Sequence, residues 1–191
     1  MRRVLFTGVL CILVAGIGVP SRASAQAAAT TAHHQATAGE TDILLAHWNA
    51  IGNKLIAQAE DFPEDKYEYK PTPQVRSFAA QLIHAAAVMY WCVDSAAGKK
   101  PRYSDDPARD NLKTKAQVVA FVKKAVRDGA VSIQQQGDAG ARASVKDWDG
   151  KVERQSDLAY EVIEHSGEHY GQLVVYYRLN GLVPPESRPK K

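Results

Sequence analysis

Hydrophobic side chains recur at helical spacing in four separate stretches of the chain. The first stretch starts near Thr41 and places apolar residues at i, i+4, i+7 and i+11, which form one stripe on a helix. These residues are Leu44, Trp48, Ile51 and Leu55. Phe62-Pro63 ends this predicted helix, and the prolines between residues 61 and 76 exclude a continuous helix there.

The second and third predicted helices each begin at a hydroxyl side chain. Ser77 is a typical N-cap residue at the start of an apolar run. Thr114 is followed three residues later by Gln117, which is the spacing of a capping box. Gly129 lies within the third helix, where it costs about 1 kcal/mol relative to alanine. We expect residues 137–154, which are rich in glycine, aspartate and lysine, to form a long connection.

The fourth stretch starts at Ser156 or Asp157 and runs to Leu179, where Asn180-Gly181 is a typical C-terminal stop. No stretch alternates polar and apolar residues at a period of two, so no strand is predicted. Four amphipathic helices joined by loops predict an all-α fold, a four-helix bundle.

The first residues have the composition of an export signal. Arg2 and Arg3 precede an apolar run over residues 4–19, and Ala23-Ser24-Ala25 then supplies small residues at the spacing of a cleavage site. The apolar run is too short for a good membrane span. We therefore expect residues 1–25 to be a cleavable signal peptide, and the protein to be periplasmic or secreted without a stable membrane anchor.

We expect the other residues to form three parts: a flexible lead-in (26–39), the helical bundle (40–185) and a basic tail (186–191). The predicted leader carries three arginines and no acid, so 21 of the 24 basic residues remain, against 21 acidic ones. A neutral mature chain argues against nucleic-acid binding, which needs clustered lysine and arginine. Cys92 then remains as a single cysteine in an apolar helix, so we expect no intramolecular disulfide and a buried, unreactive thiol.

The segment Glu-His-Ser-Gly-Glu-His-Tyr-Gly-Gln in the fourth predicted helix contains two histidines four residues apart. His165 and His169 therefore share one helix face, with Cβ atoms about 5–6 Å apart. Two imidazoles at this spacing can bind one metal ion at about 2.0–2.1 Å. His84 lies in the second predicted helix, and a bundle core can bring such faces together. Three histidine ligands and one open position are typical of a catalytic metal site.

Helix phase suggests neighbours for this site, and the pattern leaves alternatives open. Gln172 and Tyr176 share the face of the two histidines and are candidates for orienting a substrate.

The segment also fits H-x-x-E-H, the inverted zinc-peptidase signature, in which Glu168 would be a general base, but such enzymes need a further ligand well downstream. Otherwise Glu168 is a supporting or solvent-facing residue. His47, off the main stripe of the first helix, is a candidate fourth ligand or proton carrier. In a further alternative the histidines are ordinary core or surface residues and bind no metal.

Several residues together carry a resemblance to a known family. They are Trp48, Phe62, Tyr67, Ser77-Phe78, Leu82-Ile83-His84, the run His165-x-x-x-His169-x-Gly171-Gln172, and Tyr177-Arg178-Leu179-Asn180-Gly181 with Pro184-Pro185. Over residues 40–185 the chain resembles the DinB-like (DinB/YfiT) superfamily of metal-dependent four-helix-bundle proteins. The resemblance implies that His84, His165 and His169 bind a divalent transition metal, commonly zinc or nickel.

The resemblance also carries expectations about function. Relatives often form dimers, so a homodimer is one expectation, and some relatives transfer small thiol cofactors or isomerise thiol adducts. Export argues against thiol transfer, because low-molecular-weight thiols are scarce outside the membrane. We therefore expect an exported protein in which one metal assists hydrolysis or transfer on a small substrate. The alternative is a non-catalytic metal-binding or structural bundle protein.

Overall fold

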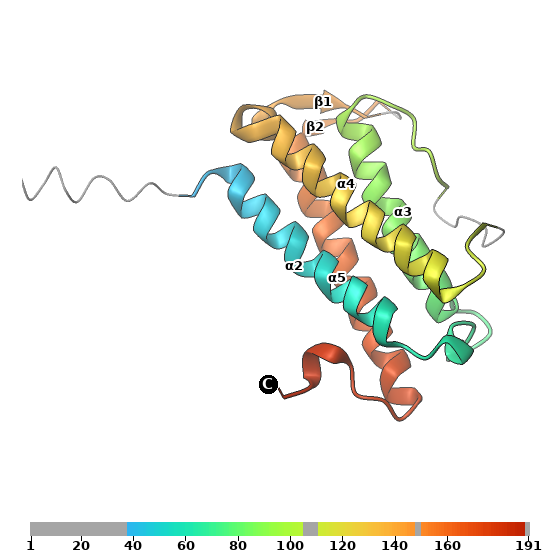
Figure 1. Cartoon of the computed structure of the whole chain (residues 1–191). Helices are drawn as coiled ribbons and strands as arrows, with labels where there is room; N and C mark the ends of the chain where they lie inside the picture. The colour runs from blue at the N-terminus through green and yellow to red at the C-terminus, as the bar shows by residue number, and fades with distance from the viewer. Residues whose placement is uncertain (1–37, 105–110, 148–149, 190–191) are drawn as a thin grey trace, which may run out of the picture. The chain divides into compact units, whose positions relative to one another are not determined.

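The computed structural model describes residues 38–104, 111–147 and 150–189, which form a bundle of four long helices (Figure 1). The helices are α2 (Glu40–Asp61), α3 (Phe78–Ala96), α4 (Lys115–Arg142) and α5 (Gln155–Leu179). Short 3₁₀ turns, η1 (Glu64–Lys66) and η3 (Pro185–Ser187), follow α2 and α5. The predicted signal peptide and most of the predicted lead-in lie outside the described residues.

The helices form two antiparallel pairs. Arg142 at the end of α4 donates to Glu40 at the start of α2 (3.1 Å), so these two helices run in opposite directions. The Gln155 side chain at the start of α5 donates to the Ala96 carbonyl at the end of α3 (3.2 Å), which fixes the second pair. Around the bundle the order is α2, α4, α3 and α5, so α2 and α3 lie on one diagonal and α4 and α5 on the other.

The predicted caps of α3 and α4 are confirmed. The Ser77 hydroxyl accepts a hydrogen bond from the Ala80 N–H (3.3 Å). Thr114 and Gln117 form the reciprocal capping box, with N···O distances of 3.2 and 3.0 Å. These bonds satisfy amide donors that the first turn of a helix leaves unpaired. α5 starts at Gln155, one residue before the predicted start.

The predicted long connection over residues 137–154 is wrong. α4 continues to Arg142 through a kink at Gly137, whose φ of 59° lies in the left-handed region that favours glycine. A small antiparallel hairpin follows, formed by β1 (Ser144–Lys146) and β2 (Val152–Arg154). Each strand has only three residues, which is too short to produce a recognisable alternation in the sequence. The fold is therefore helical with a small two-stranded sheet.

Stacked aromatic rings close one end of the bundle. The ring of Phe62, which ends α2, stacks on that of Phe78 at the start of α3, with centroids 3.7 Å apart. Tyr177 near the end of α5 meets both rings at steep angles, with centroid distances of 4.9 and 6.0 Å. Aromatic contacts of this kind contribute beyond the area that they bury. They join three helices at the end of the bundle where α3 begins.

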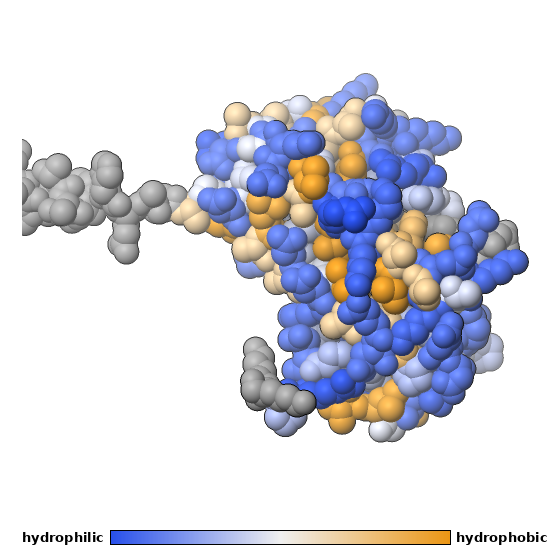
Figure 2. Space-filling model, viewed as in Figure 1, coloured by the Kyte–Doolittle hydropathy of each residue, from blue (hydrophilic) through white to orange (hydrophobic). Residues whose placement is uncertain are grey.

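On the face drawn in Figure 2 hydrophilic residues predominate, and hydrophobic patches lie between them. Within the described ranges, no helix is both long and apolar enough to cross a bilayer.

Candidate metal centre

Three histidine side chains from two helices converge inside the bundle. His84 comes from α3, and His165 and His169 come from α5. His165 Nε2 lies 3.1 Å from His84 Nε2 and 3.0 Å from His169 Nε2. One ring nitrogen of each histidine lies within 4.8 Å of the other two. We call these residues the three-histidine group, and they are the three histidines that the sequence singled out.

The local sequence of both helices allows this approach. α5 is helical through Gly167 and Gly171, so His165 and His169 lie one turn apart with ring centroids separated by 4.4 Å. On α3, residues 81–87 are all buried. Three of them are consecutive alanines after the histidine, and such small side chains let neighbouring helices come close to the α3 backbone.

Burial keeps His169 uncharged. His84 and His169 expose only 8% and 5% of their surface, and His165 is partly buried. Burial, and after it the nearby charges of the other two histidines, lowers the pKa of His169 from 6.5 to about 3. Its imidazole is therefore neutral at physiological pH. A neutral imidazole keeps a lone pair for a metal and need not lose a proton to bind one.

The donor set fits a divalent transition ion. A neutral imidazole has one N–H and one acceptor nitrogen, so a proton can bridge two Nε2 atoms but cannot hold three together. Two nitrogens bound tetrahedrally to one ion at about 2.1 Å lie about 3.4 Å apart, close to the observed separations of 3.0 and 3.1 Å. Imidazole ligands suit zinc, nickel, copper and iron rather than magnesium or calcium. The group therefore could hold one such ion, and its ligands alone do not choose the element.

The two predicted orienting residues lie beyond the histidines along α5. Gln172 accepts a hydrogen bond from the Gln81 side chain, with an N···O distance of 2.6 Å. The hydroxyl of Tyr176 donates to the main-chain carbonyl of Arg76 (2.5 Å), and burial raises the pKa of this phenol. Both side chains therefore have protein partners on the side of α3.

The other two candidates lie away from the group. Glu168 is exposed on α5, and His47 is exposed on α2. Among the described residues, the cluster of possible metal ligands contains neither of them. The peptidase alternative therefore has no carboxylate base within the cluster itself.

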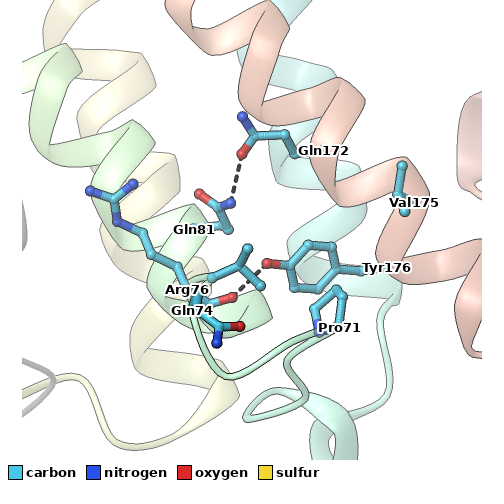
Figure 3. A pocket seen from close by; sticks show the side chains of 8 residues that line it. Pro71, Gln74, Arg76, Gln81, Gln172, Val175 and Tyr176 are labelled. Carbon is cyan, nitrogen blue, oxygen red and sulfur yellow. Dashed lines mark hydrogen bonds between the residues drawn. The ribbon is translucent and has the colours of Figure 1, made fainter.

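A pocket of about 640 Å³ is lined by residues of the loop before α3, of α3 and of α5 (Figure 3). Its walls include Val75 and Arg76 from the loop before α3, Gln81 from α3, and Gln172, Val175 and Tyr176 from α5. Gln81 precedes His84 by three residues, and Gln172 follows His169 by three residues. Because α3 and α5 are antiparallel, this amide pair lies one helical turn from the histidines on both helices.

Sequence reasoning singled out Gln172 and Tyr176 but not the other residues that line this pocket, among them Gln81 and Arg76. Gln81 could have been found, because a residue three positions before His84 shares its helix face. Arg76 could not, since it lies before the cap in a loop whose conformation no periodic pattern predicts.

Comparisons with known proteins agree with this fold. A sequence model of the DinB family matches residues 34–188. A DinB-like protein from Bacillus cereus ATCC 10987 superposes with a TM-score of 0.64 at 16% sequence identity, covering 74% of this chain and 93% of that one. A DinB-like protein from Bacillus subtilis gives a TM-score of 0.59 at 20% identity, covering 77% and 99%. No curated protein matches the sequence. Because the family model spans most of the sequence, the chain belongs to the DinB family.

Proposed function

We propose that the protein binds one divalent transition metal, zinc or nickel, through His84, His165 and His169, and that this metal assists hydrolysis or group transfer on a small substrate. The observation that carries the proposal is that three Nε2 atoms from two helices lie close enough together for one metal ion to bind all three. Burying polar groups costs stability unless they gain partners. A shared metal ion would be a partner for all three nitrogens at once.

The ligand set suits catalysis more than a structural role. Three neutral imidazoles leave the charge of the ion uncompensated and one position open, so a bound ion would supply Lewis-acid chemistry toward a carbonyl or phosphoryl oxygen. The pocket one turn away would hold the substrate. Gln172 and Tyr176 line the wall of this pocket and would orient the substrate. Glu168 is exposed and does not line the pocket, so it is a less suitable candidate for this role. Export and a homodimer are part of the same proposal.

Metal content tests the proposal directly. We expect the untagged protein to contain close to one equivalent of zinc or nickel by elemental analysis, and His84→Ala and His169→Ala to lose it. His47→Ala is the matched control and should keep the metal, because His47 is exposed on α2 outside the group. Failure of the parent protein to take up added zinc or nickel would overturn the proposal. One equivalent of metal without turnover on hydrolase and transferase substrates would favour the non-catalytic alternative.

A further inference from the structure

Gln81 is a buried polar side chain in the wall of the pocket. It lies on α3, three residues before His84, and exposes only 5% of its surface. Its side-chain nitrogen donates to the carbonyl oxygen of Gln172 on α5, with an N···O distance of 2.6 Å (Figure 3). Burying an amide costs stability unless the amide gains hydrogen bonds. The bonds that Gln81 makes therefore indicate why this position carries a glutamine.

The same amide nitrogen also serves Tyr176. Burial raises the pKa of this phenol, and a hydrogen bond with the Gln81 side chain is the largest of the causes that oppose the rise. The Tyr176 hydroxyl uses its one proton in the bond to the Arg76 carbonyl, so toward Gln81 its oxygen can only accept. One N–H group of Gln81 is therefore used by Gln172, and the other is directed to Tyr176.

The remaining polar atom of this side chain shows that the two donors matter. Gln81 Oε1 is buried and has no hydrogen-bond partner among the described residues. A buried acceptor without a donor is costly, and an apolar side chain of similar size would avoid that cost. Packing alone therefore does not explain a glutamine at this position. Contact with the two pocket residues that line the same wall on α5 does.

The bond to Gln81 also fixes which end of the Gln172 amide is available. In Figure 3 the oxygen of Gln172 points toward Gln81, and its nitrogen points away. Gln172 is exposed on α5, so a ligand can reach it. Because its oxygen is held by Gln81, Gln172 offers N–H donors to such a ligand. A ligand that hydrogen-bonds with it must supply an acceptor oxygen.

We propose that Gln81 is a positioning residue of this site, which acts by holding the Gln172 amide with its N–H groups turned to the ligand. The ligand that this arrangement favours carries an acceptor oxygen, such as that of a carbonyl or hydroxamate group. The orientation of Gln172 is a property of the metal-free protein. Recognition of a ligand beside the three-histidine group rests on the proposed function, because Gln172 lies one helical turn from His169.

Side-chain ¹⁵N relaxation of the metal-free protein tests the positioning role without any metal. Gln81→Met keeps the length of the side chain and removes its N–H groups. In this variant the order parameter of the Gln172 amide should fall below about 0.6, the range of flexible groups. Gln74→Met is the matched control, because Gln74 is an exposed glutamine of the same pocket, and it should leave Gln172 ordered. A flexible Gln172 in the parent, or an unchanged order parameter in Gln81→Met, would overturn the proposal.

Binding of acetohydroxamate to the zinc-loaded protein, measured by titration calorimetry, tests the choice of ligand. Gln81→Met and Gln172→Met should each weaken binding about fivefold, which is the effect of one hydrogen bond. The double variant should bind no more weakly than Gln172→Met, because Gln81 acts through Gln172. Additive losses would contradict this role, and Gln74→Met should bind like the parent. Circular dichroism and metal analysis establish that each variant is folded and holds zinc.

The two measurements distinguish this proposal from the metal site. If the parent takes up no zinc, the proposed function fails, and the relaxation result alone supports or overturns the positioning role. If the parent holds one equivalent of zinc and binds acetohydroxamate no better than Gln81→Met does, the metal site stands and the positioning role fails.

Discussion

The two antiparallel helix pairs of this bundle are held together by different chemistry. Between α2 and α4 the contact is tight and mostly apolar. The indole of Trp48 lies where a Cβ on Gly129 would be, since such an atom would approach the ring to 1.9 Å. The indole N–H donates to the Val126 carbonyl at 2.8 Å. At Gly52 a Cβ would come within 2.5 Å of the Val126 side chain. Each glycine therefore admits a specific neighbour.

Between α3 and α5 the middle of the contact is polar. It contains the three-histidine group and, one turn away, the Gln81–Gln172 amide pair. Buried polar groups of this kind add less stability than apolar packing and are costly when unsatisfied. The comparison indicates that the contact between α2 and α4 mainly stabilises the fold. Between α3 and α5, the polar groups of the site take the place of part of the apolar packing. Mutations in the two regions should therefore have separable effects.

Trp48→Ala should produce the largest change in stability. Removing a fully buried indole leaves a cavity and a lost hydrogen bond, so we expect the free energy of unfolding to fall by about 3–5 kcal/mol. Urea unfolding measures this loss. Val131→Ala, at an exposed position of α4, should change stability by less than about 0.5 kcal/mol. Metal content per folded molecule should stay unchanged in Trp48→Ala, and its loss would show that the two regions are not separable.

Metal binding should stabilise the protein through α3 and α5 alone. Zinc at about 100 times its dissociation constant should add about 2.7 kcal/mol to the free energy of unfolding, because it binds only the folded state. His84→Ala should abolish this gain, whereas His47→Ala should retain it. A chelator should return the protein to its metal-free stability without unfolding it, since the apolar core does not include the ion. Unfolding by the chelator would instead identify a structural metal.

Gly129→Ala should destabilise the protein by a smaller amount. Overpacking against Trp48 costs about 1–3 kcal/mol, and the better helix propensity of alanine returns up to about 1 kcal/mol. We therefore expect a net loss of about 1–2 kcal/mol in urea unfolding. Gly171→Ala is the matched control, because an added Cβ meets nothing within 4 Å there. It should be neutral or stabilising, and equal losses in both variants would show that close approach to Trp48 is not the reason for Gly129.

The same comparison shows how far the sequence alone predicts this molecule. The caps at Ser77 and Thr114 and the face shared by His165 and His169 are local patterns, and each is confirmed. The α2 stripe is confirmed at Leu44, Trp48 and Leu55, which are buried, whereas Ile51 is only partly buried. The meeting of His84 with the α5 histidines required knowledge of which helices pack together. Helix periodicity leaves that choice open.

Other features could not be predicted, because they depend on packing between distant parts of the chain or on elements too short to give a sequence pattern. Gly129 was expected to weaken α4, yet the helix is intact there and the glycine serves the approach of Trp48. The hairpin was invisible because three-residue strands give no periodic signal. Arg76 belongs to the pocket through the path of its loop, which sequence patterning does not specify.

Cys92 offers the mildest probe, because the thiol is already present and no residue has to be replaced to follow it. Burial, and after it the charges of Glu161 and Glu153, raises the pKa of this thiol to about 12. At pH 8 only about one thiol in 10⁴ would then be ionised, since each pKa unit is a tenfold change. We expect the native protein to react with a disulfide reagent at least about 100-fold more slowly than the urea-unfolded chain. Rapid labelling of the native protein would contradict the burial of this thiol.

The labelling rate then reports how often α3 separates from its neighbours. Zinc should slow labelling, because an ion shared by His84 and His169 ties α3 to α5, and His84→Ala should remove that effect. Trp48→Phe weakens the contact of α2 with α4, where the indole meets Gly129 and the Val126 carbonyl. If it speeds labelling as strongly as metal removal does, the two helix pairs open together and the division between a stabilising pair and a site-bearing pair fails. If it leaves the zinc-dependent part of the rate unchanged, α3 and α5 open by themselves, which is what a pocket that must admit a substrate between them requires.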